Sequence, residues 1–196
     1  MKQTTAHNEL KPTGEEFLRA ETERIRKTSL RGIKNIPQEL RALPSWVVYK
    51  LEPRKEKDGR VKMGKPPANP TTGRNVSPNS PESFITFDRA VSALRANKPG
   101  NLAGIGLAMV KGSGLVGIDL DDALNPDGSP LPWASAILDR VPGYCEVSPS
   151  GRGLRVFGRG TLPENGGKHP VRPNPNISVT RCKQPLGTFV EANSTR

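Results

Sequence analysis

The stretch Leu115-Val116-Gly117-Ile118-Asp119-Leu120-Asp121 ends in alternating apolar and acidic residues. Side chains of a β-strand point alternately to its two faces, so Asp119 and Asp121 share one face while the apolar residues between them point to the core. Asp122 is expected to turn away from this pair. The stretch therefore predicts a core strand that presents two carboxylates on one surface.

Two carboxylates about 6 to 7 Å apart on a sheet repel each other, and a hard cation such as Mg²⁺ or Mn²⁺ relieves the repulsion. One interpretation of Asp119 and Asp121 is therefore a metal site. The other is that the acidic group only ends a strand and enters the loop Asn125-Pro126-Asp127-Gly128. Asp-x-Asp is short and common, so the pattern alone leaves both interpretations open.

The segments before this strand predict a helix followed by two strands. Ser80-Pro81 is a good N-cap and first-turn pair, and apolar residues recur after it at helical spacing, so residues 81–97 are expected to form a helix. Two apolar runs, 104–110 and 115–121, flank Lys111-Gly112-Ser113-Gly114. This arrangement predicts a hairpin between central strands.

Other segments give further helix and strand signals. Trp46–Leu51 is rich in β-formers, with Trp46 assigned to the core, and Lys57-Asp58-Gly59-Arg60 predicts a hairpin turn after it. Ile36–Leu43 is a short amphipathic piece with Pro37 at a first-turn position. The remaining expected elements are a helix at 132–141, strands at 144–148 and 154–157, and weaker strands at 176–180 and 187–191.

The length of 196 residues fits one compact domain with an extension. Residues 1–34 are polar and basic, with a helix expected from Glu15 to Leu30 that carries only a thin apolar stripe. We interpret them as an N-terminal extension and residues 35–196 as the domain. The 20 glycines and 20 prolines predict a loop-rich fold.

Charge is spread unevenly along the chain. The net charge is +11 in all, with +7 in residues 1–65, −1 in 66–145 and +5 in 146–196. Basic flanks around an acidic centre suit a polyanionic partner held by the flanks and cations held in the middle. The alternative is that the excess of Lys and Arg only keeps the protein soluble, and composition does not separate the two.

Cysteine and histidine usage argues against a structural zinc site. Cys145 and Cys182 lack zinc-ligand spacing, and His7 and His169 lie far from both in the sequence. No apolar run reaches the roughly 18 residues that span a bilayer, and the polar N-terminus has no signal-peptide core. We therefore expect a cytoplasmic protein.

A second chemical signal lies in Ser148-Pro149-Ser150-Gly151-Arg152-Gly153-Leu154-Arg155, between two expected strands. Glycines let the backbone approach a ligand closely, hydroxyls and backbone N–H groups bond phosphate, and guanidinium groups bind it in bidentate fashion. The segment therefore predicts a triphosphate cradle. Taken alone, without the neighbouring Asp pair, it is better interpreted as an ordinary Gly-rich hairpin turn that carries arginines.

Several short motifs occur together in one order and spacing: Trp46-Val47-Val48-Tyr49-Lys50, Lys65-Pro66-Pro67, Asn69-Pro70-Thr71-Thr72-Gly73, the helix at 81–97, Gly104-Ile105-Gly106-Leu107, Ile118-Asp119-Leu120-Asp121 and Glu146-Val147-Ser148-Pro149-Ser150-Gly151-Arg152-Gly153-Leu154-Arg155. This series resembles the N-terminal primase-polymerase domain of phage and plasmid replication proteins, in the archaeo-eukaryotic primase superfamily. The resemblance spans residues 36 to about 160.

The resemblance implies an α/β catalytic domain of the α+β type, with a mixed sheet and an RNA-recognition-motif-like core. It implies a DNA primase and DNA polymerase that uses Mg²⁺ or Mn²⁺, a DNA template and nucleoside triphosphates. Asp119 and Asp121 take the metal-binding and catalytic positions, with Glu191 as the third acidic residue. The residues assigned to nucleotide binding are Ser148, Ser150, Gly151, Arg152, Gly153, Arg155 and Lys65.

The chain departs from the usual pattern at two places. Arg155 stands where many members carry His, and Arg cannot act as a neutral acceptor or proton carrier. The segment Phe189-Val190-Glu191 fits the third acidic motif loosely, and the chain stops at Arg196, so the closing strand and a replicative helicase domain are expected to be absent. Two alternative functions therefore stay open: a degenerate domain that binds DNA or nucleotide without polymerising, and a metal-dependent nuclease.

Overall fold

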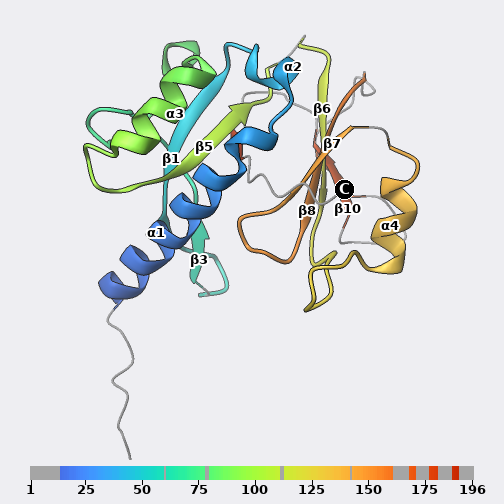
Figure 1. Ribbon diagram of the computed structural model, residues 1–196. Helices are drawn as coiled ribbons and strands as arrows, with labels where there is room; N and C mark the ends of the chain where they lie inside the picture. The colour runs from blue at the N-terminus through green and yellow to red at the C-terminus, as the bar shows by residue number, and fades with distance from the viewer. Residues whose placement is uncertain are drawn as a thin grey trace, which may run out of the picture.

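Two antiparallel sheets with helices packed against them make up the fold (Figure 1). The computed structural model describes residues 14–59, 61–77, 80–110, 113–141 and 143–160, and the backbone of three further strands, β9 (Lys168–Pro170), β10 (Ile177–Thr180) and β11 (Gly187–Phe189). The predicted α/β class is thus confirmed, whereas the predicted mixed sheet is wrong, because every strand pairing in the described part of the chain is antiparallel. The RNA-recognition-motif-like core stays a prediction.

The first sheet has the strand order β11-β5-β1-β4, with β1 at Trp46–Lys50, β4 at Pro67–Ala68 and β5 at Leu102–Ala108. Helix α3 (Phe87–Ala96) packs on β1 and β5. Every residue of β5 is buried, as is the predicted core residue Trp46, whose Nε1 donates to the carbonyl oxygen of Leu40 at 3.1 Å. This sheet carries the larger part of the apolar core.

The second sheet has the order β7-β8-β6-β10-β9, with β6 at Leu115–Leu120, β7 at Tyr144–Val147 and β8 at Leu154–Arg159. Helix α4 (Pro132–Leu138) lies against it, on the right in Figure 1. Leu120 and Leu154 from the sheet and Ala134 from the helix are buried in one cluster. The predicted strands at 144–148 and 154–157 are therefore confirmed as a hairpin.

Short elements complete the fold. The predicted hairpin turn, described over residues 57–59, follows β2 (Glu52–Lys55) and precedes β3 (Val61–Gly64), and these two strands form a separate two-stranded ribbon. The remaining elements are the one-turn helix α2 (Gln38–Arg41) and the 3₁₀ turns η1 (Ile33–Asn35) and η2 (Pro81–Ser83). None of the helices in the described part of the chain has both the length and the apolar composition needed to cross a membrane.

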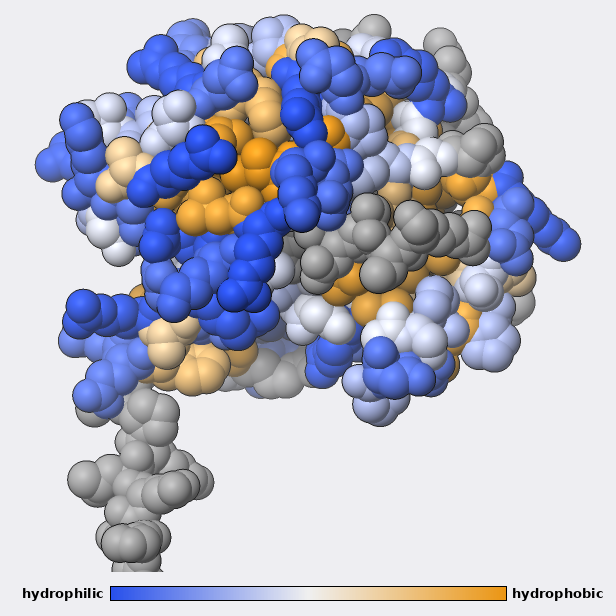
Figure 2. Space-filling model, viewed as in Figure 1, coloured by the Kyte–Doolittle hydropathy of each residue, from blue (hydrophilic) through white to orange (hydrophobic). Residues whose placement is uncertain are grey.

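Helix α1 (Gly14–Gly32) confirms the helix expected from Glu15 to Leu30. It packs against β5, and its Ile25 is buried with Tyr49 of β1 and with Leu51, which follows that strand. The outward side carries a diagonal band of hydrophilic residues (Figure 2). The domain division at residue 34 stays a prediction, although residues of the proposed extension contribute to the core.

The predicted hairpin between 104–110 and 115–121 is wrong. Strand β5 pairs with β1 and β11 in the first sheet, whereas β6 pairs with β8 and β10 in the second. Both sides of each strand already have partners, so the segment between them carries the chain from one sheet to the other. A Gly-rich connection is compatible with both arrangements, and only the long-range pairing distinguishes them.

The predicted helix at 81–97 begins later than expected. Ser80-Pro81 starts only the turn η2, because Ile85 then forms a β-bridge with Trp46. Thr86 caps α3 instead, and its Oγ1 accepts from the N–H of Arg89 at 3.3 Å. The helix is therefore ten residues long and still buries Phe87, Val91 and Leu94 as the apolar spacing predicts.

Candidate nucleotide and metal site

Three charged residues lie in one row across adjacent strands of the second sheet. Glu146 of β7 is opposite Arg155 of β8, and Arg155 is opposite Asp119 of β6. Directly opposed residues of an antiparallel pair project from the same face. The sheet therefore brings the two chemical signals of the sequence onto one face, with Asp119 and Arg155 36 positions apart in the chain.

The Nε of Arg155 donates to Oδ1 of Asp119 at 2.8 Å. The side chains of Arg155 and Asp119 are 17% and 34% exposed, so the ion pair is partly shielded from water. A charge-assisted bond in such a setting is stronger than one at the open surface. Arg155 thus holds the carboxylate of Asp119 in a defined position.

The acidic residues after β6 turn out of the sheet. Asp121 and Asp122 are exposed, and Asp122 has a left-handed backbone with φ of 46°. Arg152 lies at the same place, with its Nε 3.2 Å from Oδ1 of Asp122 and its carbonyl oxygen bonded to the N–H of Leu124 at 3.1 Å. As predicted, Asp122 diverges from Asp119.

The turn between β7 and β8 is closed by its own hydrogen bonds. The N–H of Ser148 donates to the carbonyl of Gly153, and that of Gly151 to the carbonyl of Ser148, each at 2.8 Å. The hydroxyls of Ser148 and Ser150 lie 2.8 Å apart, and the N–H of Gly153 reaches Oγ of Ser148 at 3.2 Å. Hydroxyl and backbone N–H groups therefore converge within this turn.

Gly153 allows this turn to touch the acidic strand. A Cβ added at Gly153 would lie 2.8 Å from the carbonyl oxygen of Leu120 and 3.6 Å from Cα of Asp121. Real Cβ atoms do not approach backbone this closely, so the position needs glycine. The predicted proximity of the Ser-Gly-Arg turn to the Asp-x-Asp segment is confirmed.

Lys65 lies in the connection between β3 and β4, close enough to helix α1 for its charge to act on Glu21. Its charge and, more strongly, the hydrogen bonds from Arg24 lower the pKa of Glu21 on α1. Arg24 also donates to the carbonyl oxygen of Pro149 in the turn at 3.1 Å. Lys65 is therefore connected to the turn through two residues of α1, and its assigned contact with nucleotide stays a prediction.

Sequence reasoning assigned no role to Glu146, whose side chain is fully buried. Burial, followed by the charge of Glu146, raises the pKa of the Tyr144 hydroxyl. The hairpin pattern contained the necessary signal, because a turn at 148–153 places Val147 opposite Leu154 and Glu146 opposite Arg155. The position of Glu146 opposite Arg155 thus follows from the length of the turn.

The third predicted metal ligand, Glu191, lies outside the described residues. Within the part of the chain that the structure describes, no group of three or more His, Cys, Asp or Glu side chains is placed to hold a metal ion. The assignment of Asp119, Asp121 and Glu191 as metal ligands therefore stays a prediction.

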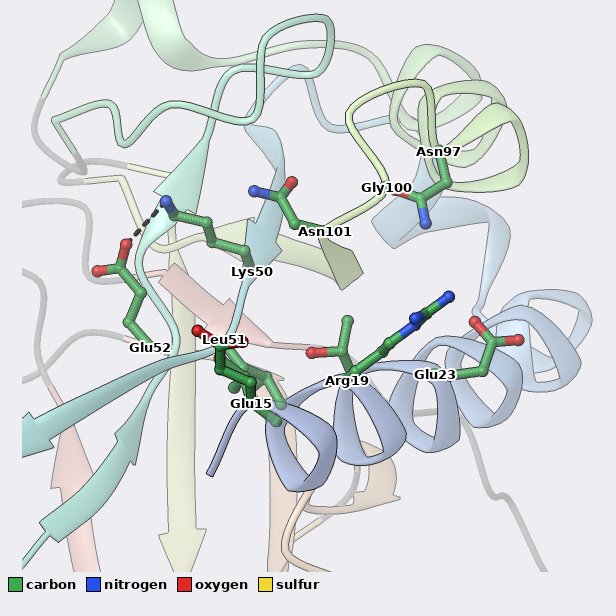
Figure 3. A pocket seen from close by; sticks show the side chains of 11 residues that line it. Glu15, Arg19, Glu23, Lys50, Leu51, Glu52, Asn97, Gly100 and Asn101 are labelled. Carbon is green, nitrogen blue, oxygen red and sulfur yellow. Dashed lines mark ion pairs between the residues drawn. The ribbon is translucent and has the colours of Figure 1, made fainter. Parts of the chain in front are cut away.

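A cavity of about 600 Å³ lies elsewhere, between α1, the β1–β2 corner and the loop before β5 (Figure 3). Arg19 and Glu23 of α1 face it, and Lys50 pairs with Glu52 across its rim at 2.7 Å. None of the predicted site residues that the structure describes lines it. Its lining carries charges of both signs.

A comparison with protein-family models found no match. Among curated proteins, the chain is similar to a protein named DNA primase-polymerase from Nitratiruptor phage NrS-1, with 33% identity over 123 residues. The matched residues are 61% of this chain and 15% of that relative, so the chain spans a small part of the relative's length. The similarity agrees with the family resemblance of the motifs.

Proposed function

We propose that this protein performs template-dependent nucleotidyl transfer, as the catalytic segment of a cytoplasmic DNA primase and polymerase. The observation that carries the proposal is the contact of the Ser-Gly-Arg turn with the Asp-x-Asp strand, fixed by the bond between Arg155 and Asp119. The similarity to a protein named DNA primase-polymerase supports it. The proposed substrates are a DNA template and nucleoside triphosphates, with a replicative helicase as a further partner.

Asp119 and Asp121 are the proposed ligands of Mg²⁺ or Mn²⁺, with Glu191 as the third. Their oxygen donors suit hard cations. A carboxylate has two oxygens with about four lone-pair sites, so Asp119 can accept from Arg155 and still bind a cation. Such metals lower the pKa of an attacking hydroxyl and neutralise phosphate charge.

The chain's own residues supply binding and orientation. Arg155 and Arg152 place two guanidinium groups beside the carboxylates, where they can bond phosphate oxygens. Ser148, Ser150 and the backbone of the turn offer hydroxyl and N–H donors for the same phosphates. Binding thus orients the triphosphate toward the acidic strand.

Incorporation of a labelled nucleotide onto a primed DNA template, with Mg²⁺ or Mn²⁺, tests the proposal. The double variant Asp119→Ala with Asp121→Ala should lose at least about 100-fold in rate, since both proposed metal ligands are gone. Asp127→Asn is the matched control, because Asp127 lies in the exposed loop after the strand and bonds Ser129. It should keep normal activity.

One observation also favours a second function. Arg155 occupies one oxygen of Asp119, an arrangement that suits a domain which binds DNA or nucleotide without polymerising. Tight DNA binding with no incorporation by the unaltered protein would establish that function and remove the polymerase proposal. Degradation of the template without added nucleotides would instead identify a nuclease.

A further inference from the structure

Helix α1 carries two similar ion pairs, each between a Glu and the Arg three positions later in the helix. Arg24 bonds the carboxylate of Glu21 through Nε and Nη2, both at 2.8 Å. Arg26 bonds Glu23 in the same way at 2.8 and 3.0 Å. The two pairs lie on different sides of the helix, so their arginines face different parts of the protein.

Only the first pair reaches the turn between β7 and β8. Nη2 of Arg24 donates to the carbonyl oxygen of Pro149 at 3.1 Å, across 125 positions of sequence. Among the described residues, every side-chain hydrogen bond of Arg26 goes to Glu23. Arg26 follows Arg19 by two helical turns, and Arg19 and Glu23 face the cavity in Figure 3.

Glu21 prepares Arg24 for this contact. Arg side chains lose considerable conformational freedom when they are fixed. The bidentate bond to Glu21 already fixes the planar guanidinium, so the bond to Pro149 costs little further ordering. The buried position of Pro149 keeps its carbonyl away from most competing water.

The bond from Arg24 to Pro149 lies in the part of the turn that is proposed to bind phosphate. Pro149 lies between Ser148 and Ser150, whose hydroxyls bond each other and the N–H groups of Arg152 and Gly153. Gly153 already rests on the carbonyl of Leu120. The turn is therefore anchored to β6 on one side and to α1 on the other.

We propose that Arg24 is a positioning residue, which holds the Ser148–Gly153 turn in its nucleotide-binding shape through the carbonyl of Pro149. The proposal rests on the proposed function for its effect on nucleotide affinity. It assigns the N-terminal helix a part in the site, although Arg24 touches neither metal nor substrate. The turn would otherwise have to be ordered when the nucleotide binds.

Steady-state incorporation kinetics test this on the full chain. Arg24→Ala should raise the KM for nucleoside triphosphate about 3- to 10-fold, the loss expected for one charge-assisted bond, and change kcat by less than about 2-fold. Arg24→Lys should also raise KM, because an ammonium cannot form the same fork to Glu21 and Pro149. Arg26→Ala, which removes the same charge from the same helix, should leave both constants within about 2-fold.

Equal effects of Arg24→Ala and Arg26→Ala would overturn the proposal in favour of a general charge effect on DNA or nucleotide. Normal KM in Arg24→Lys would overturn it too, since charge alone would then suffice.

Amide hydrogen exchange without nucleotide separates this inference from the proposed function. In Arg24→Ala the amides of residues 148–153 should exchange at least about 5-fold faster than in the unaltered protein, whereas those of β6 should not change. Arg26→Ala should match the unaltered protein. Unchanged exchange in Arg24→Ala sinks the inference even if the protein polymerises, and faster exchange supports it even if the protein does not.

Discussion

Arg155 and Asp119 face each other on neighbouring strands, and Nε of Arg155 donates to Oδ1 of Asp119 at 2.8 Å. This bond joins the segment proposed to bind phosphate to the acidic strand. It therefore sets the starting position from which the proposed site takes up a cation and a triphosphate. Its strength can be measured directly.

A double-mutant cycle with Asp119→Asn and Arg155→Gln should give a coupling energy of about 1 kcal/mol, because both side chains are partly shielded from water. The neighbouring pair of Asp122 and Arg152 is the control. These side chains are 64% and 75% exposed, so their coupling should stay below about 0.5 kcal/mol. Urea unfolding of the single and double variants measures both, and equal couplings would show that shielding has no effect here.

Gly153→Ala should destabilise the fold by about 1 to 3 kcal/mol and weaken nucleotide binding. The added Cβ would press on the carbonyl of Leu120 at 2.8 Å and push the turn away from the acidic strand. Gly160→Ala is a suitable control, since its Cβ would meet only Val116 at an ordinary 3.6 Å. Thermal unfolding and binding of a fluorescent nucleotide report the two effects, and full stability of Gly153→Ala would contradict the close approach.

The local part of the site was predictable from the sequence. A period of two residues predicts the strand that carries Asp119, and glycines with serines mark the turn at 148–153. The same period wrongly extends the strand to Asp121, because β6 ends at Leu120 and Asp121 lies in the turn that follows. Both patterns depend only on neighbouring residues. The hydrophobic spacing that predicted α3 is local as well, and it failed only at the start of the helix, where Ile85 pairs with Trp46 of another strand.

Long-range relationships were not predictable in this way. The separation of β5 and β6 into two sheets depends on partners at 46–50 and 177–180, which no pattern within 104–121 contains. The bond from Arg24 to Pro149 links segments 125 positions apart, so the thin apolar stripe of α1 gave no sign of it. Such contacts are set by how the elements pack.

Acidification should weaken the contribution of Glu21 to stability. The bonds from Arg24 hold the pKa of Glu21 below its ordinary value of 4.5, so the folded state favours the charged form. The resulting stabilisation is present above pH 4.5 and is lost as the pH falls through the lowered pKa. The difference in unfolding free energy between the unaltered protein and Glu21→Gln should therefore shrink on going from pH 6 to pH 3.

The same comparison in an Arg24→Gln background provides the control for this titration. Without the guanidinium, Glu21→Gln should have a much smaller pH-dependent effect, although the charge of Lys65 remains nearby. Chemical denaturation at a series of pH values measures it. An unchanged pH dependence in that background would show that Arg24 is not the main cause.

Asp121→Asn should reduce metal-dependent incorporation at least about 100-fold, because Asp121 is a proposed cation ligand beside the phosphate-binding turn. Asp122→Asn should keep at least about half of the activity, since Asp122 turns away with φ of 46° and pairs with the exposed Arg152. Asn tolerates this left-handed backbone, so the control should also fold normally. Rates measured over a Mn²⁺ titration compare the two variants, which lose the same charge one residue apart. Equal losses would mean that the acidic segment acts through its overall charge, and the assignment of Asp121 as a specific ligand would then be wrong.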